Sequence, residues 1–205
     1  MADSSTGGFL APASLSPDED AVLDNLLQAL VVGVVGLPGA MVRPRWQPSP
    51  PPMPEANVDW CAIGVVDEES EFNISLVHSS ASAAFPSGYS TSYDNDIVSV
   101  LATFYGPTAR GLAKRLRTGL MIPQNREFLY ATGLQLMEIP GKTLFVPEII
   151  NQITLRRADI TLRFRRRTTL NWSILNILQM VGSIVSDSGP GSALLTPHSF
   201  NPLKE

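Results

Sequence analysis

Side chains that commonly perform acid–base, nucleophilic or metal chemistry are few in this sequence. The two histidines, His78 and His198, lie far apart in the chain, and the only cysteine is Cys61. A Ser/His/Asp mechanism would depend on His78, and no nucleophile-elbow motif lies near it. A zinc site needs several cysteine or histidine ligands at short spacings, which this sequence does not provide. We therefore expect no catalytic residue and no bound metal.

Two further patterns suggest binding sites at first sight. Asp94 and Asp96 alternate around Asn95, but the glycine and closing glutamate of a calcium loop do not follow at the required distance. Gly33 and Gly36 are followed by no lysine, so they do not form a phosphate-binding loop. We interpret the two aspartates as turn residues and the glycines as a helix end, and we expect no cofactor.

Arginines are concentrated late in the chain. Residues 155–168 contain six arginines and a single acidic residue, Asp159. Such a basic stripe can contact another subunit, form a solvated surface or bind the phosphates of a nucleic acid. Phe164 is the only aromatic residue among the arginines, and the rest of the chain is acidic. Subunit contact is therefore the favoured interpretation, and DNA contact is the least favoured one.

Charge is also distributed unevenly along the whole chain. The net charge is −4, but residues 1–109 carry −11 and residues 110–205 carry +7. One interpretation is that the two halves interleave in the folded subunit, so that their charges cancel. The other is that each subunit has an acidic flank and a basic flank, which would suit head-to-tail contacts between identical copies.

Length and composition favour a single principal domain. The chain has 205 residues, of which 44% are hydrophobic, enough for one substantial core. We predict a flexible N-terminal arm over 1–15, a single α+β domain over 16–185 and a flexible C-terminal tail over 186–205. No basic leader and no apolar stretch of about 20 residues is present, so we expect neither secretion nor membrane insertion. The lone cysteine fits synthesis in a reducing cytoplasm, where we expect Cys61 to be buried.

Two helices are expected from the spacing of apolar residues. Ser16, Pro17 and Glu19 match a capping box at the start of the first helix, which should end between Gly33 and Gly39. The second helix should begin after residues 106–108 and break at Pro123. Its buried face should consist of Leu112, Ala113, Leu116 and Leu120. Only a short helical turn is expected near 128–131.

Strands are expected over 41–46, 59–66, 73–78, 93–105, 134–139 and 151–170. Pro44 makes the first of these an edge strand. The proline-rich segment 47–54 that follows should be extended, either as a connector over its own domain or as a strut against a neighbouring subunit. We expect 73–78 to pair with 59–66 across an acidic turn at 67–71, and 79–92 to be a flexible loop.

Several blocks of this sequence resemble the phage neck and tail-terminator family. The first comprises Val42-Arg43-Pro44-Arg45-Trp46-Gln47-Pro48, the proline run 50–54 and residues 59–64. Tyr105-Gly106, residues 119–127 and Phe164-Arg165-Arg166 follow in the same order. The proline–tryptophan block followed by Ile122-Pro123-Gln124-Asn125-Arg126-Glu127 is the most specific pair. The resemblance covers roughly residues 20–170.

The resemblance implies a small antiparallel sheet packed against two helices, with extended N- and C-terminal arms. It also implies a non-enzymatic structural virion protein of a tailed bacteriophage, made in the host cytoplasm. Six copies would form a ring at the head–tail junction that terminates the tail tube and joins it to the neck. Its partners would be itself, the tail tube and neck or head-completion proteins, with genomic DNA passing through the lumen without sequence-specific binding.

Two alternatives to this role stay open. The first is a head-completion adaptor or collar subunit of the same neck, and the second is a DNA-binding module that uses the arginine-rich strand. For the ring-forming role, ten residues are candidates for the subunit interface. They are Arg43, Arg45, Trp46, Pro51, Pro52, Arg157, Arg163, Arg165, Arg167 and Trp172.

Overall fold

A computed structural model describes residues 4–12, 14–16, 20–71, 74–82, 86–138, 141–150 and 153–176. Contacts divide the chain into two compact units. The larger unit comprises Ser14–Leu76 and Ser92–Leu170, and the smaller unit comprises Met1–Ala13, Val77–Thr91 and Asn171–Glu205. The predicted boundaries at 15/16 and 185/186 stay a prediction, and the predicted C-terminal tail lies outside the described residues.

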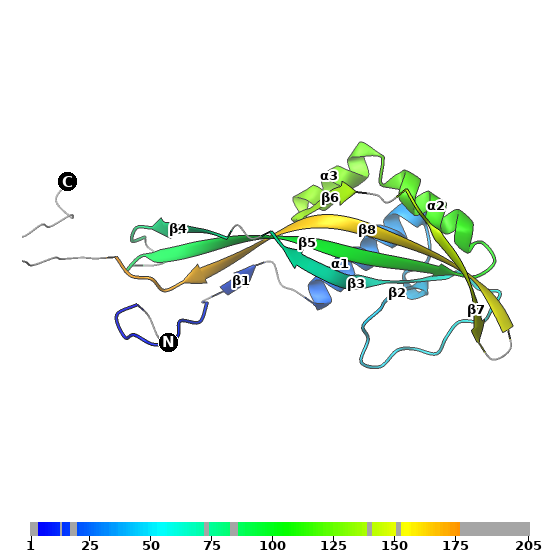
Figure 1. Cartoon of the computed structure of the whole chain (residues 1–205), viewed down its shortest axis with the longest axis horizontal. Coiled ribbons are helices and arrows are strands. Elements are labelled where there is room, and N and C mark those ends of the chain that lie inside the picture. Colours follow the sequence, from blue (N-terminus) through cyan, green and yellow to red (C-terminus); the bar gives the residue numbers. More distant parts are fainter. Residues whose placement is uncertain are drawn as a thin grey trace, which may run out of the picture. The chain divides into compact units, whose positions relative to one another are not determined.

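Eight strands form one sheet among the described residues (Figure 1). They are β1 (Ser14–Ser16), β2 (Val42–Pro44), β3 (Trp60–Ser70), β4 (Ser75–Ser79), β5 (Tyr89–Tyr105), β6 (Leu134–Glu138), β7 (Leu144–Ile150) and β8 (Ile153–Trp172). The strand order is β1-β8-β5-β3-β2, with β4 paired to β5 and both β6 and β7 paired to β8.

The sheet is mixed rather than wholly antiparallel as the resemblance implied. Strand β3 is antiparallel to β5, and β6 and β7 are antiparallel to β8, but β2 runs parallel to β3. The long connection over 45–59 makes this possible, because it carries the chain back to the end of the sheet where β2 began. The expectation of an edge strand at Pro44 is confirmed, since β2 is the outermost strand on its side.

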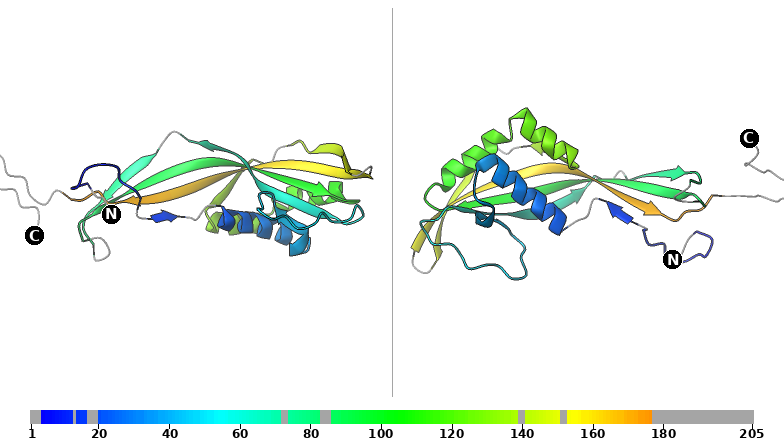
Figure 2. Two further views of the ribbon diagram at one scale, coloured as in Figure 1. Left: turned by 90° about the horizontal axis from the view of Figure 1, so that it is seen from below. Right: turned by 180° about the vertical axis from the view of Figure 1, so that it is seen from behind.

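Where the structure describes the chain, three α-helices, rather than two, cover one face of the sheet (Figure 2). They are α1 (Ala21–Val35), α2 (Ala109–Gly119) and α3 (Pro123–Ala131), and a short 3-10 helix, η1 (Gly39–Met41), follows α1. Helix α3 is longer than the turn expected near 128–131. Pro123 occupies its first turn, where a proline needs no backbone donor, so it starts a helix instead of ending one.

The core of the larger unit lies between the helices and the sheet. Alternate residues of β5 and β8 supply the sheet side, and the apolar stripes of the three helices supply the other side. Cys61 of β3 is fully buried here, as expected, and burial raises the pKa of its thiol. The largest fully buried side chains are Phe104, Phe164, Leu27, Ile63, Leu116, Leu120, Leu129, Leu134, Ile160 and Leu162.

The two ends of α1 differ in how well the sequence predicts them. The capping box was wrong: Ser16 ends strand β1, and the helix begins at Ala21 after Asp20, without a side-chain cap. Residues 17–19 lie outside the described residues. The expected end is confirmed, because Gly36 adopts a left-handed conformation with φ of 82° and donates its N–H to the Val32 carbonyl.

Three expectations for the middle of the chain were wrong. The acidic residues 67–70 continue strand β3, which pairs with residues 96–99 of β5 beyond a bulge at Val65/Asp67, so they form no turn. Strand β4 pairs with β5 and not with β3. Residues 89–92 of the expected flexible loop begin strand β5, where Ser90, Thr91 and Ser92 are buried.

The carboxylate of Asp59, which precedes strand β3, fixes the start of α2. Asp59 accepts hydrogen bonds from the backbone N–H of Thr108, at 2.9 Å, and from its hydroxyl, at 2.6 Å. Gly106 makes this approach possible, because its φ is +109° and a Cβ there would lie 2.4 Å from the Asp59 Oδ1. The chain therefore turns from β5 into α2 at a position defined by Asp59.

The smaller unit is held together by hydrogen bonds between its segments. Ser4 donates its N–H to the Ser173 carbonyl, and its hydroxyl accepts the N–H of Leu175. The ring of His78 lies 2.9 Å from the Ser90 hydroxyl and 2.6 Å from the Asn176 side-chain oxygen. His78 therefore links β4, β5 and the chain that follows β8.

Candidate subunit interface

Four predicted interface arginines project from the sheet face opposite the helices. Arg157, Arg163, Arg165 and Arg167 occupy alternate positions of β8, and the residues between them face the core. Strand alternation therefore places all four side chains on the same, outer face. The same face receives the odd-numbered residues of β5 from 97 to 105 and, through the register of β3 with β5, Trp60, Ala62 and Gly64.

An aromatic–arginine cluster, defined as Arg43, Trp60, Tyr105 and Arg157, lies at one end of this face. The rings of Trp60 and Tyr105 stack across the β3/β5 pair with centroids 4.3 Å apart and planes 9° apart. The guanidinium of Arg43 lies 5.6 Å from the Trp60 ring, and that of Arg157 lies 6.0 Å from the Tyr105 ring. Cation–π attraction favours these positions, so the cluster presents ordered arginines on a flat aromatic base.

Arg45 and Trp46 fold back over β3 from the end of β2. Arg45 donates its N–H to the Ile63 carbonyl and an Nη2 hydrogen to the Thr103 hydroxyl, both at 2.7 Å. A Cβ at Gly64 would lie 2.9 Å from the Arg45 Cβ, so this crossing requires a glycine in β3. Trp46 donates its ring N–H to the Val65 carbonyl while 66% of the residue stays exposed. Its ring is available for contact at the β3 edge.

The proline-rich segment is tied to its own subunit. Arg43 donates from Nη1 to the carbonyls of Pro52, at 2.8 Å, and Pro51, at 3.3 Å. These bonds agree with a connector over its own domain. Pro51 and Pro52 are exposed on the outside of the segment, so the strut against a neighbouring subunit stays a prediction.

Three of the six arginines in residues 155–168 pair with carboxylates of the same chain. Arg163 lies 3.6 Å from Glu69, Arg165 pairs with Glu71, and Arg157 pairs with Asp159 at 2.8 Å and with Glu148 at 3.4 Å. At Arg163 and Arg165 the basic half of the chain meets the acidic half, as the interleaving interpretation expects. This pairing lowers the net positive charge that β8 would offer to a nucleic acid.

The two remaining candidates lie elsewhere along β8. Arg167 places its guanidinium 4.2 Å from the ring centroid of Tyr93, which is a further cation–π contact. Trp172 is the last residue of β8, is half-buried and belongs to the smaller unit. Within the larger unit, the structure therefore brings Arg43, Arg45 and Arg157 together around Trp60 and Tyr105, and Arg167 lies beside Tyr93 instead.

Groups that could perform chemistry do not form a reaction site in the described residues. His78 contacts Ser90, but Ser90 is only 2% exposed, so a substrate cannot reach its hydroxyl. No group of three or more possible metal ligands is present in the part of the chain that the structure describes. No described helix is long and apolar enough to cross a membrane.

Asp94 and Asp96 lie within strand β5, so their interpretation as turn residues was wrong. Asp96 is buried, with 9% of the residue exposed. Burial, followed by the charge of Asp94, raises the pKa of the Asp96 carboxyl. Hydrogen bonding from Ser70 and Thr168 and the charge of Arg166 oppose this rise.

Comparison with known protein families agrees with the resemblance in the sequence. A family model described as phage neck terminator protein matches residues 21–188. The chain belongs to this family. A neck terminator is a structural protein of the phage neck, which places it in the virion. No curated protein matches the chain.

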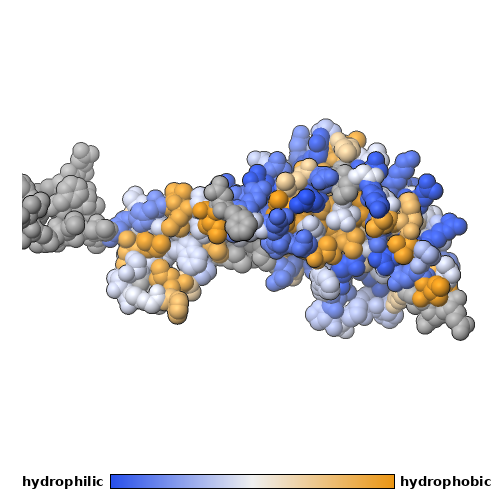
Figure 3. Space-filling model, in the orientation of Figure 1, coloured by the Kyte–Doolittle hydropathy of each residue, from blue (hydrophilic) through white to orange (hydrophobic). Residues whose placement is uncertain are grey.

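Sequence reasoning missed the strand β7 of this neck terminator, as it also missed the short strand β1. The large apolar residues of β7 are exposed, including Phe145 at 55% and Ile149 at 73%. Figure 3 shows the apolar patch at the right-hand end of the larger unit, where β7 lies in Figure 1. The run of β-branched and aromatic residues over 144–150 was the available signal, and Pro147 obscured it. Proline is compatible with β7 because this is an edge strand.

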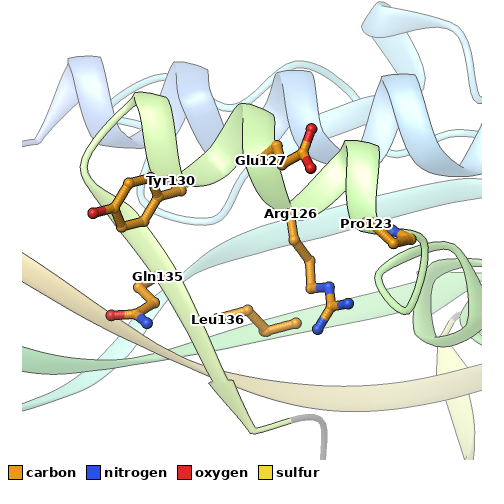
Figure 4. Close-up of a pocket in the computed structure, with 6 residues that line it drawn as sticks. All are labelled: Pro123, Arg126, Glu127, Tyr130, Gln135 and Leu136. Carbon is orange, nitrogen blue, oxygen red and sulfur yellow. The ribbon is translucent and has the colours of Figure 1, made fainter.

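A pocket of about 350 Å³ lies between α3 and β6 of the neck terminator (Figure 4). Arg126 extends below α3 toward Leu136, whereas Glu127 points away from it (Figure 4). The two charged groups therefore do not form an acid–base pair in this pocket. Its lining residues are Pro123, Arg126, Glu127, Tyr130, Gln135 and Leu136.

The block 119–127, which carries part of the resemblance to neck terminators, positions the helices. Asn125 donates its side-chain N–H to the Gly119 carbonyl at 2.8 Å, which caps the end of α2. A Cβ at Gly119 would lie 2.3 Å from Cγ1 of Val34, so glycine allows α1 and α2 to approach closely. Both contacts are packing interactions within the subunit, so the part of the block that makes them is architectural.

Proposed function

We propose that this neck terminator assembles as a homo-hexameric ring at the head–tail junction. The ring terminates the tail tube and joins it to the neck, and it contacts both the tail tube and neck or head-completion proteins. Genomic DNA passes through the lumen without sequence-specific binding. The protein acts through assembly and performs no catalysis.

The observation that carries this proposal is the exposed apolar surface of β7 and the start of β8. Leu144, Phe145, Val146, Ile149 and Ile153 are each at least 41% exposed. Large exposed apolar groups that gather on a soluble protein often mark an interaction site. In a ring, every subunit covers such a surface with its neighbour.

The aromatic–arginine cluster adds a second surface suited to contact. Arginine and aromatic side chains are enriched in protein interfaces, where they supply large contact areas and directed hydrogen bonds. In this chain, cation–π contacts and the bonds from Arg43 to the proline segment already hold them in place. Association therefore orders few additional side chains, which favours binding.

A phage in which the gene for this chain is inactivated tests the proposed role. We expect electron micrographs of lysates to show full heads and unattached tails whose lengths vary, because neither joining nor termination occurs. Supplying the wild-type chain from a plasmid should restore joined particles of uniform tail length. Joined particles in the absence of the chain would contradict the proposal.

The same micrographs, together with images and DNA-binding measurements of the purified chain, distinguish the alternatives. Heads that lose their DNA although tails of normal length form would favour a head-completion adaptor, and twelve-fold rings of the purified chain would favour that role or a collar. A monomer that retains DNA at low salt and releases it as salt rises would favour a DNA-binding module.

A further inference from the structure

We propose that the β7–β8 hairpin of one copy docks onto an acidic pocket at the opposite edge of the sheet in the next copy. The proposal rests on the ring assembly described above and identifies the two surfaces that meet. It makes the subunit contact heterologous, with unlike surfaces from identical chains.

The first surface, the hairpin patch, is defined as Arg110, Phe145, Val146 and Arg156. These residues line a cavity of about 470 Å³ between β7, β8 and the start of α2. The Arg110 guanidinium lies 5.3 Å from the Phe145 ring centroid, and Arg156 donates to the Pro107 carbonyl. Neither arginine forms an ion pair with any described residue. The patch therefore combines exposed apolar groups with two positive charges that have no acidic partner among those residues.

The second surface, the acidic pocket, is defined as Asp20, Leu23, Asp24, Trp46, Val65 and Glu68. These residues line a cavity of about 350 Å³ between α1 and β3. Leu23, Val65 and the exposed ring of Trp46 supply its apolar part. Its three carboxylates form no ion pair within the described ranges. Partial burial, followed by the charge of Asp20, raises the pKa of the Asp24 carboxyl, which a nearby cation would reverse.

The two surfaces cannot meet within one chain. Strand β7 pairs with β8 at one side of the sheet, β3 lies toward the other side, and β5 separates them. Each surface carries the charge that the other lacks, and each combines that charge with apolar groups. A second copy therefore fits both surfaces at once, and repetition of the same contact leaves no surface uncovered when the ring closes.

Charge reversal tests this pairing, because two variants that each weaken the contact should restore it when they are combined. The first variant is Arg110→Glu with Arg156→Glu, and the second is Asp24→Lys with Glu68→Lys. Each variant alone opposes like charges at every contact, so we expect association to weaken on the order of 100-fold. A matched control, Lys114→Glu with Arg115→Glu on the exposed face of α2, makes the same change in charge elsewhere. It should assemble like the wild type.

Mixing the two variants restores opposite charges at every contact. We expect an equimolar mixture, and also a single chain that carries all four substitutions, to form rings again. Light scattering after size exclusion measures the mass, and circular dichroism establishes that each variant is folded. Four-substitution chains that are folded but stay monomeric would overturn the pairing.

The two proposals fail in different ways. Rings that persist both in the Arg110→Glu/Arg156→Glu variant and in the Asp24→Lys/Glu68→Lys variant would overturn this pairing. They would leave the proposal of ring assembly intact. A wild-type chain that stays monomeric at all concentrations would contradict ring assembly, and the pairing with it.

Discussion

Glycines at two positions allow segments of the larger unit to approach each other closely. At Gly64 the neighbour is the Cβ of Arg45, which crosses strand β3, and at Gly119 it is the Val34 side chain of α1. Both glycines belong to sequence blocks that resemble the neck terminator family. The features that make those blocks recognisable are therefore packing requirements at these positions.

The substitution Gly119→Ala tests the close approach of α1 and α2. A Cβ at this position would lie 2.3 Å from Cγ1 of Val34, so we expect a loss of about 1–3 kcal/mol from overpacking. The free energy of unfolding in denaturant measures it. Adding Val34→Ala should recover part of the loss, because it removes the clashing methyl group. A fully stable Gly119→Ala variant would contradict the packing described.

The buried carboxyl of Asp96 predicts a pH dependence of stability. Because burial and Asp94 raise its pKa in the folded state, the folded protein holds this proton at a pH where the unfolded chain has released it. Stability therefore falls as pH rises from the ordinary value near 3.8 through the raised pKa. Asp96→Asn should lack this fall and should gain stability relative to the wild type as pH rises. A constant difference between the two over pH 3–7 would contradict the assignment.

The candidate interface residues show what sequence patterns can and cannot predict at this scale. The strand expected over 151–170 is enough to put Arg157, Arg163 and Arg165 on one face, because alternate residues of any strand share a face. The carboxylates Glu69 and Glu71 that pair with two of them lie more than ninety positions earlier in the chain. Such ion pairs depend on the order of the strands in the sheet, and that order cannot be predicted from the local periodicity of the sequence.

At the scale of elements, strong periodicity gave reliable predictions and weak local signals did not. Helix α2 and strand β5 carry long apolar patterns, and both occur close to where they were expected. The acidic run 67–70 extends β3 because pairing with β5 outweighs its low β-propensity. Residues 89–92 extend β5, which lies beside β8 in the sheet. The α+β class was confirmed, whereas the parallel β2–β3 pair depends on a long connection that no local pattern specifies.

Helix α2 depends on a cap from outside its own sequence. Thr108 precedes the helix and makes no cap of its own, while Asp59 accepts two hydrogen bonds from it. We expect Asp59→Ala to reduce the free energy of unfolding by about 1 kcal/mol, which is typical of a lost N-cap. Asp67→Ala, at an exposed position of β3, serves as the control and should change stability by less than about 0.5 kcal/mol. Equal effects of the two substitutions would argue against capping by Asp59.

At the scale of the whole molecule, the uneven charge of the sequence has two outcomes in the larger unit. Along β8 the basic half of the chain meets acids from the first half, and those charges are neutralised. At the two opposite sides of the sheet the charges are not neutralised. There the hairpin patch and the acidic pocket keep opposite charges beside exposed apolar groups. The interleaving interpretation therefore holds along β8, whereas an acidic and a basic flank that meet between copies stay a prediction.

Ring assembly of identical chains is the claim on which the functional account depends. Native mass spectrometry of the purified wild-type chain, supported by class averages of negatively stained particles, tests it most directly. We predict a dominant species of six times the mass of one chain, with six-fold averages that enclose a central opening. A single-chain mass that persists at every protein concentration, with no annular particles, would contradict the account.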